Sequence, residues 1–154
     1  MPVKMNYPFF CLFCILFFVV IWQQDSSAAV CQAKMYNDPA FAESRDDFSP
    51  YDKIYIIIEC DQLEAGYHIM HANWIHQNRG LVRSNRHEFD MEKEGKRGIY
   101  FWFKLTKKGP LASAFTNQDF SEKSLGDWLV EVYLDDDLMV SKNFTIDFEK
   151  PREE

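Results

Sequence analysis

The sequence predicts an all-β protein, an antiparallel two-sheet β-sandwich of about seven short strands preceded by an N-terminal signal helix. Three observations lead to this fold class. Apolar and polar residues alternate on both sides of a short acidic break in residues 125–146, and residues 51–61 are dense in β-branched side chains. No helical apolar period is sustained after the N-terminal apolar run. Because side chains of a strand point to alternate faces, these patterns indicate strands and not helices.

The predicted C-terminal hairpin, residues 125–146, shows the clearest alternation of apolar and polar residues. One predicted face of its first strand is apolar, with Trp128, Val130, Val132 and Leu134. After the acidic break at Asp135–Asp137, one face of the second strand holds Leu138, Val140, Phe144 and Ile146. Two alternating runs joined by a short polar link predict an antiparallel hairpin with one buried face.

Four upstream segments are predicted to be the strands that cover this buried face. They are Tyr51–Asp61, Tyr67–His76, Leu81–Asp90 and Gly98–Thr106. The third segment is polar on much of both faces, which predicts an edge strand. The fourth is apolar on both faces, which predicts a central strand or one with a covered face. The charged run Met91–Gly98 between them is predicted to be a turn.

The remaining segments are predicted to lie outside the confident strands. Residues 30–47 show no sustained period, so we expect an extended leader, followed by a sandwich domain over residues 48–148. Lys107–Ser124 is predicted to be a loop with at most one short strand near Leu111–Phe115. Residues 149–154 form a charged tail.

The N-terminus has the features of a secretory signal peptide. Lys4 precedes an apolar run over residues 9–22, and small residues follow at Ser27–Ala29. A bilayer span needs about 20 apolar residues, so this run is short for an anchor. We therefore expect residues 1–29 to be a signal peptide that is cleaved after Ala29, which makes the mature protein periplasmic or secreted. The alternative is a membrane anchor formed by residues 9–22.

Export changes how the cysteines are interpreted. Cleavage removes Cys11 and Cys14 and leaves Cys31 and Cys60 as the only pair, in an oxidising compartment. A disulfide between them would tie the N-terminal segment to the first predicted strand. The alternative is a buried free Cys60 and a frayed Cys31.

The net charge bears on the class of partner. It is −7, and the signal peptide contributes one Lys and one Asp, so cleavage leaves it unchanged. An acidic domain is not attracted to nucleic acid or to an anionic membrane surface, so neither is expected as a partner. We expect a protein or another ligand of the envelope or the extracellular space, and no membrane span after cleavage.

Four segments of the sequence together resemble a known fold family. They are FSPYDKIYIII, LEAGYHIMHANW, YFWFKL and LGDWLVEVYLDDDLMVSKNFTI. Their order is similar to that of immunoglobulin-like or fibronectin-like β-sandwich domains of exported bacterial proteins, over about Phe48 to Phe148. The resemblance implies an immunoglobulin-like sandwich and no particular activity, because this fold hosts many unrelated functions.

Histidines are the candidate metal ligands. His71, His76 and His87 lie on two predicted strands that fold back on each other, so a cross-strand metal site is the alternative function, as a metal-binding protein or a metal-dependent hydrolase. No nucleophile motif of a hydrolase is present in the sequence, and surface histidines explain the pattern more simply. We therefore expect a non-enzyme without a cofactor.

Aromatic residues are the candidate binding residues. They exceed what one thin core needs, and those on the predicted sheet faces include Tyr67, Tyr100, Trp102 and Tyr133. Exposed aromatic faces commonly mark contact surfaces. The leading hypothesis is an exported, non-catalytic module with a binding or structural role, acting through protein–protein contact at an edge strand or at the aromatic sheet face.

Overall fold

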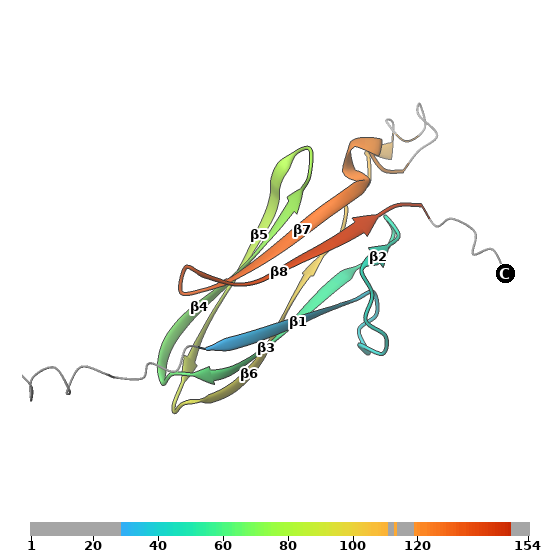
Figure 1. The fold of residues 1–154 in the computed structure, drawn as a ribbon. Helices are drawn as coiled ribbons and strands as arrows, with labels where there is room; N and C mark the ends of the chain where they lie inside the picture. Colours follow the sequence, from blue (N-terminus) through green and yellow to red (C-terminus); the bar gives the residue numbers. More distant parts are fainter. Residues whose placement is uncertain (1–28, 111–112, 114–118, 149–154) are drawn as a thin grey trace, which may run out of the picture.

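The computed structural model describes residues 29–110, 113 and 119–148. Within these residues, eight strands form two sheets that pack face to face (Figure 1). One sheet has three strands in the order β1-β3-β6, and the other has five in the order β2-β8-β7-β4-β5. The predicted all-β, two-sheet sandwich is confirmed.

The three-stranded sheet is antiparallel throughout. It consists of β1 (Val30–Tyr36), β3 (Ile54–Leu63) and β6 (Gly95–Phe103). The β-branched run of β3 occupies the centre, with Ile56 and Ile58 fully buried. A central strand is covered on both sides by neighbours, which is where such a run is favoured.

The five-stranded sheet contains both predicted hairpins. The strands β7 (Gly126–Leu134) and β8 (Asp137–Ile146) form one, and β4 (Gly66–His76) and β5 (Gly80–Met91) form the other. The two-residue strand β2 (Asp47–Phe48) runs parallel to β8 at one edge, and β5 is the opposite edge, as predicted.

The β7–β8 turn explains the acidic break in the pattern. Asp135 and Asp136 both have positive φ, 50° and 75°. Two successive left-handed residues make a turn whose twist matches that of the flanking strands, and Asp tolerates this conformation better than most residues. A short 3-10 helix, η1 (Glu122–Ser124), precedes β7.

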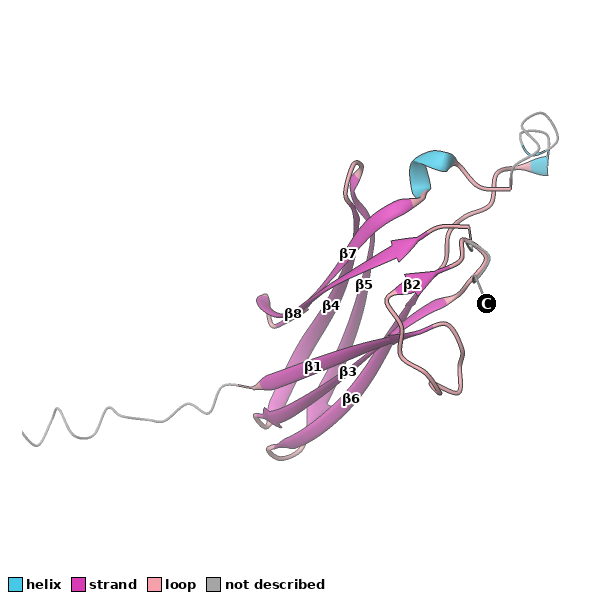
Figure 2. Cartoon of the chain, turned by 45° about the vertical axis from the view of Figure 1, so that its right-hand side comes forward, coloured by secondary structure: helices cyan, strands magenta, loops and turns pink. Residues whose placement is uncertain are grey.

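Figure 2 shows the two sheets as facing layers, and an aromatic cluster joins them. Trp74 on β4 stacks on Phe103 of β6 with 5.1 Å between ring centroids, and Trp128 on β7 lies 5.0 Å from the same ring. All three side chains are buried. The Trp74 indole Nε1 donates a hydrogen bond to Asn85 Oδ1 at 2.8 Å, so its one polar atom is satisfied inside the core.

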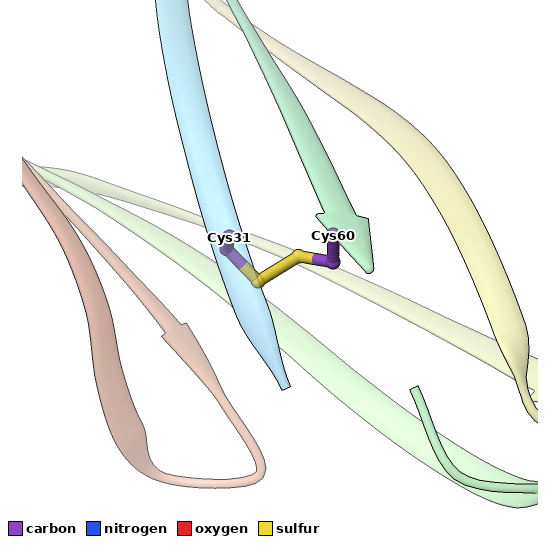
Figure 3. Close-up of a disulfide and its surroundings, with 2 residues drawn as sticks. All are labelled: Cys31 and Cys60. Atoms are coloured by element: carbon purple, nitrogen blue, oxygen red, sulfur yellow. A yellow bond between two sulfur atoms is a disulfide. The ribbon is translucent and has the colours of Figure 1, made fainter. Parts of the chain in front are cut away.

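The N-terminal segment differs from the prediction. Residues 30–36 belong to the sandwich and not to a leader, because β1 pairs along its whole length with β3 and its Met35 is 1% exposed. A disulfide joins Cys31 to Cys60, which face each other in the register of these two strands (Figure 3). The sandwich thus begins at Val30 and not at Phe48.

Two further strand predictions are wrong. The predicted turn Met91–Gly98 shrinks to residues 92–94, because β5 reaches Met91 and β6 starts at Gly95. The strand predicted to be central is an edge, because β6 pairs with β3 alone among the described residues. The apolar residues on its outward face, Tyr100 and Trp102, are not covered by a neighbouring strand and are exposed.

The prediction that Leu138 lies on the buried face of its strand is also wrong. A register shift between Val132 and Tyr133 changes the pairing, so that Val132 opposes Val140 and Tyr133 opposes Leu138. The bulge turns Leu138 outward, where it is 53% exposed. Phe144 and Ile146, beyond the bulge, are buried as predicted.

Some predictions fall on residues outside the described ranges. These are the signal peptide, the charged tail and nearly all of Leu111–Phe115. In the part of the chain that the structure describes, there is no helix with the length and apolarity that crossing a bilayer requires.

Candidate binding surface

The outer face of the three-stranded sheet carries a group of aromatic side chains, which we call the aromatic patch. On β6, Ile99, Phe101 and Phe103 point inward, so the alternating residues between them point away from the core. Tyr100 is 59% exposed and Trp102 is 38% exposed. The patch consists of Tyr36, Phe41, Tyr55, Tyr100 and Trp102.

Phe41 connects the members of the patch. It belongs to the loop after β1, and its ring lies 5.4 Å from Tyr36, 5.6 Å from Tyr55 and 6.4 Å from Tyr100, measured between centroids. The loop is held by its own geometry: the Ala40 amide donates to Asp38 Oδ1, and Phe41 has a φ of 54°. The loop thereby places an additional aromatic ring on the sheet face.

Two cations lie over the ring of Trp102. Lys53 Nζ is 4.3 Å from its centroid, and the Arg83 guanidinium carbon is 4.7 Å away. Arg83 sits on β5 opposite Trp74, so its side chain reaches from one sheet to the other. A cation over an indole face is attracted by the ring quadrupole, by about 0.5–2 kcal/mol.

A groove adjoins the patch between the two edge strands β5 and β6. The β5 side of this β5–β6 groove consists of Asn85, Arg86 and His87, and its β6 side consists of residues 97–102. Arg97 lies over the ring of Phe89 at 5.7 Å, and His87 stacks on the same ring at 5.9 Å. The groove is therefore lined by positive and aromatic groups.

The ion pairs nearby leave most of these cations uncompensated. Arg86 is paired with Glu88, with 2.7 Å between Nη2 and Oε1. Among the described residues, no carboxylate lies within ion-pair distance of Lys53, Arg83 or Arg97. In a chain of net charge −7, this is a local concentration of positive charge.

The structure brings two of the four predicted binding residues together. Tyr100 and Trp102 lie in the aromatic patch, whereas Tyr67 and Tyr133 lie on β4 and β7 of the other sheet. The Tyr67 hydroxyl donates to the Glu88 carboxylate, which raises the pKa of Tyr67 and lowers that of Glu88. The Tyr133 hydroxyl donates to Glu131 at 2.8 Å, which raises the pKa of Tyr133.

The three candidate metal ligands are not assembled into a site. His71 lines a shallow depression with Asn73, Tyr133 and Asp136. His76 is buried, its Nε2 donating to the Leu125 carbonyl at 3.0 Å and its Nδ1 accepting from the Asn78 amide at 3.1 Å. Both of its ring nitrogens are thus already engaged. Throughout the described ranges, no three His, Cys, Asp or Glu side chains are grouped so that they could hold a metal ion.

Six residues of this surface are not identified from the sequence, namely Tyr36, Phe41, Lys53, Tyr55, Arg83 and Arg97. Tyr36 and Phe41 lie in a segment without a sustained period, and Arg83 and Arg97 lie in a predicted edge strand and a predicted charged turn. The one available signal is the polarity of the third predicted strand, because the arginine on the inward face of this edge strand, Arg83, has no core partner.

Comparisons with known proteins concern the fold alone. No protein-family model matches the sequence, and no curated protein matches it. Among solved structures, the chain is similar to an alkylpurine DNA glycosylase from Pseudomonas fluorescens bound to DNA containing an abasic site analog, with a TM-score of 0.49 and 10% identity. The match covers 82% of this chain and 34% of the glycosylase, so the chain spans about a third of that protein's length.

A second similar structure is an immunoglobulin-like protein from Pseudomonas aeruginosa. Its TM-score is 0.41 at 8% identity, and the match covers 80% of this chain and 99% of that one. At these TM-scores and identities, neither similarity supports an argument about a ligand or an activity.

Proposed function

We propose that the protein is an exported, non-catalytic binding module that contacts a protein partner through the aromatic patch and the adjoining edge of β6. The observation that carries the proposal is the exposure of Tyr100 and Trp102 beside an open strand edge. Aromatic residues and arginine are the residue types enriched at protein interfaces, and both are concentrated here.

Covering the exposed rings of Tyr100 and Trp102 with a partner is energetically favourable. A large aromatic ring in water retains apolar area whose removal contributes about 25 cal/mol per Å². Tyr100 and Trp102 form no part of the core, so covering them costs the fold nothing. The main-chain groups on the free edge of β6 also lack a strand partner among the described residues, and an added strand would satisfy them.

Two features support export as part of the proposal. The first is the predicted signal peptide with its cleavage position after Ala29. The second is the disulfide between Cys31 and Cys60, since disulfides form and persist in oxidising compartments. The mass of the mature protein tests the cleavage: an N-terminus at Val30 supports it, and an intact leader supports the anchor formed by residues 9–22.

Site-specific photo-crosslinking tests the binding surface. A photoreactive residue replaces Tyr100 in the producing organism, and a matched control replaces Ser141, which is exposed on β8 of the other sheet. We expect one protein to be captured from position 100 and not from position 141, and capture to be lost with Trp102→Ala. Identical products from both positions, or no product from position 100, would overturn the proposal.

A further inference from the structure

The chemical class of the partner, an inference that rests on the proposed function, follows from the residues of the β5–β6 groove. Its β6 side is the free edge of the three-stranded sheet, formed by residues 97–102. Such an edge offers a row of main-chain donors and acceptors at the spacing of a β-strand. An extended polypeptide matches this row, whereas a polysaccharide has no main-chain amides to pair with it.

The charges around the edge determine which polypeptide fits. Arg97 lines the groove, and Arg83 lies over the ring of Trp102, another residue of the groove. Neither arginine has a carboxylate within ion-pair distance among the described residues. Two acidic residues on the neighbouring strands do not face these arginines: Glu88 is ion-paired with Arg86 and hydrogen-bonded to Tyr67, and Glu59 lies on β3, on the far side of β6.

We infer that the β6 edge takes an acidic, extended peptide segment of the partner protein. The segment adds a strand beside β6, its carboxylates lie against Arg83 and Arg97, and an apolar side chain covers Trp102. Opposite charges at an interface favour encounter and fix the register of the added strand. A segment carrying Asp or Glu at every second position places these carboxylates on one face, toward the groove.

Nucleic acid is the other polyanion that a basic groove suggests. The rest of the chain disfavours it, because the net charge of −7 repels a continuous phosphate backbone at distances beyond the groove. A short acidic segment meets only the local positive charge.

Selection from a random peptide library tests the inference with a defined probe. Phage displaying random peptides of about ten residues, roughly the length of an edge strand, are selected on the folded protein. The same selection on Arg83→Gln and Arg97→Gln variants measures what each arginine contributes. Lys123→Gln, which removes an exposed cation from η1 outside the groove, is the matched control.

We expect the selected peptides to be enriched in Asp and Glu, at alternate positions, on the wild type and on Lys123→Gln. A synthetic peptide of the selected sequence should bind at least about tenfold more weakly to each arginine variant, and more weakly as salt rises from about 50 to 500 mM. A single-stranded DNA and an anionic polysaccharide serve as competitors, and neither should displace the peptide.

The contrary outcomes separate this inference from the proposed function. Neutral or basic peptides selected at the same edge would overturn the acidic partner and leave the binding surface standing. Displacement by DNA or by the polysaccharide would overturn the peptide. If no peptide is enriched, the inference fails, and crosslinking from position 100 decides the proposed function by itself.

Discussion

His68 on β4 and Asp135 at the tip of the β7–β8 hairpin are hydrogen-bonded, with 2.6 Å between Nδ1 and Oδ2. The other ring nitrogen, Nε2, lies 2.9 Å from the main-chain oxygen of Glu64. Both partners are acceptors, so both ring nitrogens carry protons and the imidazole is cationic in this arrangement. The Asp135 carboxylate also accepts from the Ile69 amide at 2.7 Å. One side chain thus joins the β3–β4 turn to the β7–β8 turn.

This contact predicts a pH-dependent stability. The hydrogen bond to Asp135 raises the folded-state pKa of His68 above about 6.5, its unfolded value, against the opposing effect of burial. The contribution is therefore fully present below about pH 6.5 and is lost as the pH rises through the raised pKa. We expect about 1 kcal/mol, reduced by the exposure of Asp135, in urea unfolding compared at about pH 5.5 and pH 9.

The His68→Gln variant is the control for that measurement. It cannot become cationic, so the difference between its free energies of unfolding at the two pH values should be smaller than in the wild type. Equal pH dependence in both proteins would show that His68 does not carry the effect.

Strand patterns are readable from the sequence where large apolar residues occupy the buried face of a strand. In β7, Trp128, Val130 and Val132 alternate with outward residues, and the structure buries all three. The pattern is weak in β1, because its inward residues include the small Ala33 and a cysteine, which contribute little to an apolar signal. Small inward residues make a real strand resemble a linker.

The candidate surface could be predicted only in part, for a different reason. Tyr100 and Trp102 follow from the alternation of β6, which places them on one face. Phe41 and Arg83 reach them from a loop and from the other sheet. Such contacts depend on how the sheets pack, and a local period in the sequence carries no information about that.

The disulfide is predicted to contribute strongly to stability. It closes a loop over a sequence separation of 29 residues and ties the edge strand β1 to β3. Closing a loop of this length in the unfolded chain corresponds to about 3.6 kcal/mol. The Cys31→Ala/Cys60→Ala variant should lose about this free energy in urea unfolding, and reductant should destabilise the wild type and leave the variant unchanged. An effect of reductant on the variant would contradict the assignment.

The hydrogen bond between Trp74 and Asn85 is predicted to stabilise the fold, because without it the indole N–H of Trp74 has no acceptor. Asn85→Leu removes the acceptor and leaves the indole Nε1 unsatisfied beside the core, which costs about 1–3 kcal/mol. Asn85→Asp keeps an acceptor oxygen at the same place and should cost less. Guanidinium unfolding followed by tryptophan fluorescence measures both. Equal losses would mean that the hydrogen bond contributes nothing.

Truncation to alanine is predicted to destabilise the fold at an aromatic residue of the core and to leave its stability nearly unchanged at an exposed residue of the aromatic patch. Trp128 is 2% exposed and packs on Phe103, so Trp128→Ala should lower the free energy of unfolding by about 3–5 kcal/mol. Tyr100 is 59% exposed, so Tyr100→Ala should change it by no more than about 0.5 kcal/mol. Urea unfolding of both variants gives the comparison. A loss for Tyr100→Ala close to that for Trp128→Ala would show that the patch stabilises the fold, and its exposed ring would then cease to argue for a partner.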